Sequence, residues 1–412
     1  MTIIDSFAPI KYAYIDPGTG SMLLTILIGL ISVLSYGFKS LINKVSLFST
    51  NSSQNQEKLD YVIYTDSKRY WNVFEPVCEE FERNKTILHY LTQSDDDPVF
   101  NKNYQYIKPE FIGDGNKGFS KLNNLNADIL LSTTPSLDVY QWKKSKNVKY
   151  YIHIPHMCTD ITYYRMYGID YYDAILVTGK YQEEQIRKLE ELRKLPAKDI
   201  KIVGLTYFDE LKKRLDSSKR ITNEIPVVLL APSWGPSSIL NLYGSTFIDE
   251  LIKTGYEIVI RPHPQSFVSE KDTIEKLIKQ YPNIEWNRDN DNFEILNKAD
   301  IMVSDFSGVI FDYSLVFNKP IIFTNYGFDD SIYDAHWLDE QTWTFKTLPK
   351  IGEEINKDNF HNLKTIIDKC LNDDKYEQGR KEAIKESWYN IGNSARDIFL
   401  YMREKHKEVS GS

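Results

Sequence analysis

The feature that most constrains the fold of this 412-residue chain is a regular alternation of short apolar runs with helical patterns. Runs rich in β-branched and aromatic residues, such as YVIYT at 61–65, alternate with amphipathic stretches such as YQEEQIRKLEELRKL at 181–195. This alternation predicts βα units and parallel sheets. A second series of the same kind begins at Pro226 with PVVLLAP. We therefore expect an α/β chain with two Rossmann-like domains.

The segment RITNEIP at 220–226 is the expected boundary between these domains. The prediction is an N-terminal Rossmann-like domain over 59–222, a C-terminal one over 223–390, and a closing helix and tail over 391–412. Two consecutive doubly wound domains of this kind resemble the GT-B arrangement of glycosyltransferases. Open parallel sheets bind ligands beyond the carboxyl ends of their strands, so functional residues are expected where strands end.

The N-terminal segment, residues 1–48, differs in kind from the rest. Residues 22–38 read MLLTILIGLISVLSYGF without a charge, and Lys39 and Lys44 follow. Such a run is near the lower length limit for a transmembrane helix, and the lysines that follow it predict that its C-terminal side is cytoplasmic. The alternative is a helix lying in the membrane interface or docked on a partner. The polar residues 49–58 read as a linker to cytoplasmic catalytic domains at the cell membrane.

Charge and motif content exclude several classes of function. The net charge of −8 and the pI of about 5.5 argue against nucleic-acid binding. The three cysteines are widely spaced, which fits a reducing compartment. The chain contains no GxxxxGK[ST] or GxSxG motif and no zinc-like spacing, which argues against P-loop NTPases, α/β-hydrolases and a zinc site.

The stretch IMVSDFSGVIFDY at 301–313 ends an apolar run in a polar cluster, after which apolar residues resume with helical spacing. Ser307 and Gly308 at such a helix start can receive a phosphate on unpaired N–H groups. Asp305 is expected to orient a histidine or a substrate hydroxyl, and Asp312 to reach a ribose or polyol hydroxyl. The alternative is an ordinary N-cap followed by a turn glycine.

Two further loops follow predicted strands of the second domain. In RPHP at 261–264, two prolines hold His263 at the strand exit, where Arg261 and His263 can donate hydrogen bonds to a phosphate. In APSWGPSS at 231–238, Trp234 can stack on a base or another ring. The alternatives are a proline-rich turn and a loop with one packed tryptophan.

The first domain offers one candidate general base in YYIHIPHMCTD at 150–160. A neutral imidazole suits removal of a proton from an attacking hydroxyl. His153 lies within the apolar strand, where a core role is more common, whereas His156 follows the strand and is the better candidate. Asp160 can orient such a histidine.

Together RPHP, APSW and SDFSGVIFDYSLVFNKPIIF (304–323) resemble the CDP-glycerol glycerophosphotransferase family, which includes teichoic-acid primases and polymerases and capsule enzymes. The resemblance implies a GT-B fold, action at the cytoplasmic membrane face and transfer of glycerol phosphate or ribitol phosphate from a CDP-alditol to an acceptor hydroxyl, with release of CMP and no obligatory metal. It implies that His263 binds the donor diphosphate, that Ser304, Asp305, Ser307 and Asp312 line the donor pocket, and that His156 is the base.

The expected function is therefore a membrane-anchored transferase with a CDP-alditol donor and a lipid-linked or glycan acceptor. An alternative on the same fold is a glycosyltransferase that uses a UDP- or CMP-activated sugar for surface polysaccharide. A membrane-tethered binding module without activity is the alternative from another class.

Overall fold

The computed structural model describes residues 57–219, 221–324, 328–373 and 375–411. The expected membrane helix at 22–38 and residues 49–56 of the expected linker lie outside this part of the chain. Within it, no helix has the length and apolar character needed to cross a membrane.

The first sheet has seven parallel strands in the order β3-β2-β1-β4-β5-β6-β7. Its strands are β1 Leu59–Thr65, β2 Leu88–Thr92, β3 Ile107–Phe111, β4 Ala127–Ser132, β5 Val148–His153, β6 Ala174–Val177 and β7 Asp199–Ile202. Around it lie η1 Lys68–Tyr70, α2 Trp71–Arg83, η2 Pro98–Asn101, α3 Asn116–Asn123, η3 Ile161–Tyr163, α4 Lys180–Arg193 and α5 Thr206–Ser217. We call this part the first lobe.

The second sheet has six parallel strands in the order β10-β9-β8-β11-β12-β13. They are β8 Val227–Leu230, β9 Glu257–Ile260, β10 Glu285–Trp286, β11 Ile301–Ser304, β12 Ile321–Thr324 and β13 Gly352–Ile355. Its helices are α6 Ile239–Leu242, α7 Gly244–Lys253, α8 Ser266–Ser269, α9 Lys271–Gln280, α10 Phe293–Lys298, α11 Val309–Phe311, η4 Asp312–Val316, η5 Asp334–Trp337, α12 Trp343–Ile351, η6 Phe360–Asn362, α13 Leu363–Asn372 and α14 Glu377–Ser387. We call this part the second lobe.

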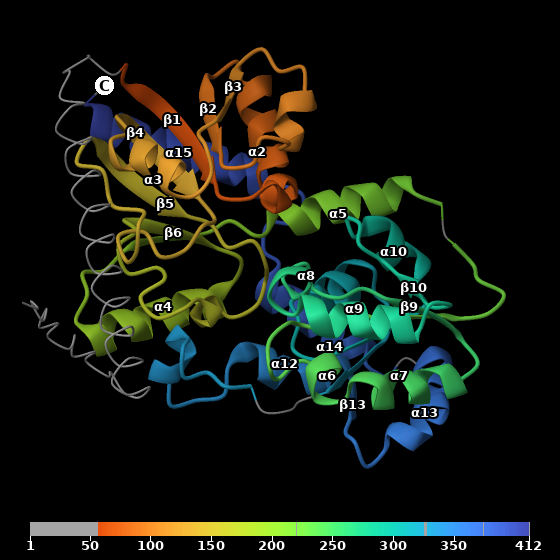
Figure 1. Ribbon diagram of the computed structural model, residues 1–412. Coiled ribbons are helices and arrows are strands. Elements are labelled where there is room, and N and C mark those ends of the chain that lie inside the picture. Colours follow the sequence, from red (N-terminus) through yellow and green to blue (C-terminus); the bar gives the residue numbers. More distant parts are fainter. Residues whose placement is uncertain (1–56, 220, 325–327, 374, 412) are drawn as a thin grey trace, which may run out of the picture. The chain divides into compact units, whose positions relative to one another are not determined.

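Both sheets have Rossmann-like strand order, with helices on both faces (Figure 1). The central strands are largely buried, as their continuous apolar runs require; β8, for example, reads VVLL with every residue buried. The sequence pattern missed β3, β10 and β13, which are edge strands. In β3, IKPEF is exposed after its first residue and contains Pro109, so it lacks an apolar run and its proline is tolerated at an edge.

The segment after β11 is helical, as its apolar spacing predicts, but its geometry is unusual. Three α-helical residues in α11 are followed by the five-residue π-helix η4, which begins at Asp312. All residues of η4 are buried. Such wider turns occur mostly as single-turn features and often at functional sites.

The end of the chain returns to the first lobe. Helix α15, Ser394–Ser410, packs on α2 and β4 (Figure 1). Its residues Ile398, Phe399 and Met402 join the core on one face of the first sheet. Helix α14 was not predicted from the sequence.

The lobes share apolar core as well as a chain connection. Phe208 and Leu211 of α5 belong to the same buried cluster as Ile310 and Phe311 of the second lobe. This packing brings the carboxyl ends of the two sheets to a common cleft, whose lining comes from both lobes.

Candidate functional site

A cleft of about 220 Å³ between the two lobes contains most of the residues singled out in the sequence. His156 comes from the loop after β5, Arg261 and His263 from the loop after β9, and Ser307, Gly308 and Asp312 from the segment after β11. All of them follow the carboxyl ends of parallel strands, where open sheets bind ligands. The lobes approach closely here, because a Cβ atom placed on Gly308 would lie 3.2 Å from Met157 Sδ.

His156 lies on the first-lobe wall of the cleft. Its Nδ1 is 3.2 Å from Thr133 Oγ1, and its ring packs against Tyr70 with a centroid separation of 4.7 Å. When Nδ1 donates to Thr133, Nε2 carries the lone pair and can accept a proton. Burial, followed by the positive charge of Arg69, lowers the pKa of His156 to about 4. The imidazole is therefore neutral at neutral pH, the form that a general base requires.

His263 faces the cleft from the second lobe, and its free ring nitrogen is a hydrogen-bond donor where that of His156 is an acceptor. The backbone N–H of Gln265 donates to its Nδ1 at 3.1 Å, so the neutral ring carries its proton on Nε2. Burial, followed by the charges of Arg69 and Arg261, lowers the pKa of His263 to about 4. A neutral Nε2–H group is a hydrogen-bond donor and suits an anionic oxygen.

Arg261 is held in place by the loop that follows β10. Its guanidinium donates to the side chain of Asn287, and it donates to the carbonyl oxygen of Asp289 at 2.8 Å. Neither partner is a carboxylate, so the positive charge of Arg261 is available to a ligand in the cleft.

Asp312 is buried at the start of η4 and lines the same cleft. Burial raises its pKa to about 7, while a hydrogen bond with Asn292 opposes this shift. At neutral pH the carboxyl group is close to its titration midpoint, so it can donate or accept a hydrogen bond to a hydroxyl group.

Ser304 and Asp305 do not line the cleft, contrary to the prediction from the sequence. The Ser304 hydroxyl donates to the Ala231 carbonyl oxygen at 2.5 Å. The buried Asp305 carboxylate accepts the backbone N–H groups of Ser233 at 2.8 Å, Ile239 at 3.1 Å and Ser307 at 3.2 Å. Both side chains therefore hold the loops that shape the cleft, because their polar atoms are used by the backbone.

His153 and Asp160 also lie outside the cleft. His153 is buried in the first lobe, with its Nε2 3.0 Å from the Tyr164 hydroxyl. Of the two histidines considered in this lobe, His156 is therefore the one that lines the cleft. Asp160 was expected to orient a histidine, but its carboxylate accepts the N–H groups of Trp343 at 2.7 Å and Thr344 at 2.8 Å. It thereby joins a first-lobe loop to the start of α12.

Trp234 stands beside the cleft without lining it. The side chain is 40% exposed, and its ring centroid is 6.4 Å from that of His263. It lines a neighbouring chamber of about 370 Å³ instead.

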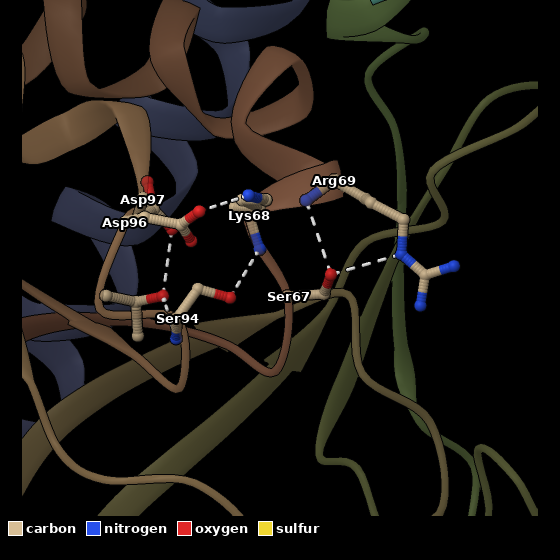
Figure 2. Close-up of polar contacts among 7 residues, drawn as sticks. Ser67, Lys68, Arg69, Ser94, Asp96 and Asp97 are labelled. Atoms are coloured by element: carbon tan, nitrogen blue, oxygen red, sulfur yellow. Dashed lines mark hydrogen bonds and ion pairs between the residues drawn. The ribbon is translucent and has the colours of Figure 1, made fainter. Parts of the chain in front are cut away.

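Arg69, which no motif in the sequence singled out, enters the cleft from the turn after β1. Figure 2 shows the two adjacent cations of this turn pointing in different directions: Lys68 is paired with Asp96, while Arg69 extends to the other side. The Nε atom of Arg69 donates to Ser67 Oγ at 3.1 Å. Within the described residues no carboxylate pairs with Arg69, so its charge is left for a ligand.

Comparison with solved structures places this arrangement among folds of two parallel-sheet α/β domains. The wall teichoic acid polymerase TagF superposes with a TM-score of 0.58 at 16% identity, covering 94% of this chain and 98% of that one. A protein of Listeria monocytogenes assigned as a UDP-N-acetylglucosamine 2-epimerase gives a TM-score of 0.54 at 13% identity, covering 85% and 98%. At these identities the likeness shows the fold, two parallel-sheet α/β domains of the GT-B kind. No curated protein matches the chain in sequence.

The model of the CDP-glycerol:poly(glycerophosphate) glycerophosphotransferase family matches residues 169–402, more than half of the chain. The chain belongs to this family. The resemblance read from RPHP, APSW and SDFSG is thus confirmed, and the protein is an enzyme of the glycerophosphotransferase type. The matched region includes the whole second-lobe side of the cleft, whereas Arg69 and His156 precede it.

Other residues at the site of this glycerophosphotransferase also went unnoticed in the sequence. Asn290 and Asn292 line the cleft, although RDNDN at 288–292 reads as a turn and helix cap. Tyr207 lines it too and donates to Asn292 Oδ1 at 2.6 Å. Its position in the sequence could have identified this loop, because RDNDN follows a short apolar segment, as the other loops at the site do.

The low histidine pKa values give a first testable prediction. In the free glycerophosphotransferase, NMR titration of the side chains of His156 and His263 should show both rings neutral down to about pH 5, against an ordinary pKa near 6.5. Between about pH 6.5 and pH 4 the two histidines bind protons in the unfolded chain but not in the folded protein. The free energy of unfolding should therefore fall as the pH is lowered through this window. Titration of either ring near pH 6.5 would contradict the buried, positively charged environment described here.

Proposed function

We propose that this glycerophosphotransferase moves glycerol phosphate from CDP-glycerol to a terminal hydroxyl of a glycerol phosphate chain, in synthesis of a teichoic-acid-type polymer. The observation that carries this is the single cleft in which His156, His263, Arg69 and Arg261 meet. A cluster of cations and neutral imidazoles without carboxylate partners suits a diphosphate, and a histidine on the facing wall suits an attacking hydroxyl.

In the proposed step the acceptor hydroxyl attacks the β-phosphorus of CDP-glycerol. A new oxygen–phosphorus bond forms, the bond from the β-phosphorus to the bridging oxygen breaks, and CMP leaves with the electron pair. His156 takes the proton of the hydroxyl on Nε2. His263 Nε2–H and the two arginines stabilise the negative charge that develops on CMP.

Donor binding also prepares the base. Burial, followed by the positive charge of Arg69, lowers the pKa of both histidines. A bound diphosphate offsets that positive charge, so the pKa of His156 rises toward the working pH, where a general base is most effective. The cleft thus makes His156 a better base when the donor is present.

We further propose that the two lobes work at the cytoplasmic face of the membrane. This rests on the uncharged run at 22–38 and on Lys39 and Lys44 after it. A growing polymer held at that surface would present its free end to the cleft.

The test of the function is to incubate the full-length protein with CDP-glycerol and a synthetic glycerol phosphate trimer, and to measure CMP by chromatography and the lengthened trimer by mass spectrometry. Both products should appear in equal amounts. CDP-ribitol, UDP-glucose and UDP-N-acetylglucosamine are run in parallel. UDP release from a sugar donor without CMP release from either CDP-alditol would instead assign the protein as a glycosyltransferase.

A further inference from the structure

A second chamber, of about 370 Å³, adjoins the cleft and shares part of its wall. Tyr70, His156 and Met157 line both spaces. His156 therefore has the cleft on one side and this chamber on another, and Thr133 fixes the orientation of the ring between them. A general base must touch the acceptor hydroxyl while standing near the phosphorus that is attacked. A chamber that shares His156 with the cleft meets this requirement.

The chamber walls carry the chemistry of a polyol site. Five aromatic side chains line it, from both lobes: Tyr70, Tyr163, Tyr164, Trp234 and Tyr333. Its size is within the range of small-molecule pockets, which combine apolar or aromatic walls with a few polar groups. Aromatic faces pack against the C–H groups of a polyol, and the phenol oxygens can bond its hydroxyls.

One cation, Arg165, lines the same chamber. Of the described residues, Asp160 is the one carboxylate that also lines the chamber, and it accepts the N–H groups of Trp343 and Thr344. The acidic groups nearby are engaged as well: Asp334 pairs with Arg193, Asp330 lies 3.2 Å from His336, and Asp329 accepts the Ser331 N–H at 3.0 Å. In the described part of the chain no carboxylate is within ion-pair distance of Arg165. A backbone bridge to Tyr333 fixes its place in the chain at the chamber wall. Its free charge points to an anionic ligand.

We propose that this chamber is the acceptor subsite and that it takes a phosphate-bearing polyol, with the phosphate on Arg165 and the attacking hydroxyl at His156. The inference rests on the proposed function and deepens it, because it places the acceptor on the far side of His156 from the donor diphosphate. Two charged substrates would then approach the base from separate spaces.

The test compares Arg165→Ala with the wild type at saturating CDP-glycerol, using three acceptors: glycerol, sn-glycerol 3-phosphate and a glycerol phosphate trimer. For the two phosphate-bearing acceptors kcat/KM should fall by about 10- to 100-fold, the worth of a hydrogen-bonded charge. For glycerol it should stay within about twofold, and so should KM for CDP-glycerol. Arg165→Lys should recover part of the loss. Arg396→Ala, an exposed arginine of α15 outside both spaces, is the matched control.

The outcomes separate the inference from the function on which it rests. An equal loss with all three acceptors, no loss with any of them, or a raised KM for CDP-glycerol would overturn the acceptor subsite while the transferase activity stands. Failure of the wild type to release CMP from CDP-glycerol with every acceptor would overturn the proposed function and the subsite together. Because Arg165 is exposed, the variant should fold, which circular dichroism checks.

Discussion

Replacing His156 by alanine should lower kcat for glycerol phosphate transfer by about 100- to 10,000-fold, the usual contribution of a positioned general base. His156 has a neutral imidazole in the cleft wall, with Nδ1 engaged by Thr133 and Nε2 left for the acceptor hydroxyl. Affinity for the donor should change little, since the proposed phosphate contacts come from His263, Arg69 and Arg261. Initial-rate kinetics of CMP release, together with calorimetric titration of CDP, measure the two effects.

A surface histidine provides the matched control. His361 is exposed in the second lobe and lines neither the cleft nor the chamber, so His361→Ala should keep wild-type kinetics. If His156→Ala retained more than about a tenth of the wild-type kcat, the assignment of the base would be wrong. Loss of CDP binding to the same extent as kcat would instead give His156 a role in holding the donor.

The second large effect is expected at Arg69, whose replacement by alanine should raise KM for CDP-glycerol by about 10- to 100-fold. The adjacent Lys68 is the internal control, because it is paired with Asp96 and points in a different direction from Arg69 (Figure 2). Lys68→Ala should change KM by less than about twofold, and Arg69→Lys should fall between alanine and wild type because lysine keeps the charge without the planar fork.

The same variant has a readout that does not depend on activity. Arg69 lowers the pKa of both His156 and His263, so NMR titration of Arg69→Ala should show both values higher than in the wild type. Unchanged pKa values, or a KM effect of Lys68→Ala as large as that of Arg69→Ala, would contradict the proposal that the Arg69 charge acts on the donor in the cleft.

The local sequence correctly predicted those features that depend on residues adjacent in the chain. Continuous apolar runs predicted the central strands, and the residues that follow them in RPHP and SDFSG lie at the cleft because parallel strands end on one edge. The edge strands β3, β10 and β13 were not predicted, because an edge strand is less buried than a central one and does not require a continuous apolar run.

The predictions from local sequence were wrong for polar side chains whose hydrogen-bond partners lie elsewhere in the chain. Asp305 and Asp160 stand in motifs that look catalytic, yet backbone N–H groups far along the chain occupy their carboxylates. Arg69 shows the reverse case: SKRY reads as an ordinary polar turn after β1, and only the direction taken by each side chain distinguishes the paired Lys68 from the free Arg69.

By itself the sequence determined the two doubly wound sheets, their order along the chain and the family, because apolar periodicity and contiguous motifs are local properties. The tertiary structure alone decided which groups share one space: that His156 meets His263 and Arg69 across the lobes, that α15 packs on the first lobe, and that a chamber with Arg165 adjoins His156. The physical reason is that these contacts join residues far apart in sequence, and their geometry depends on how whole sheets pack through a shared apolar core.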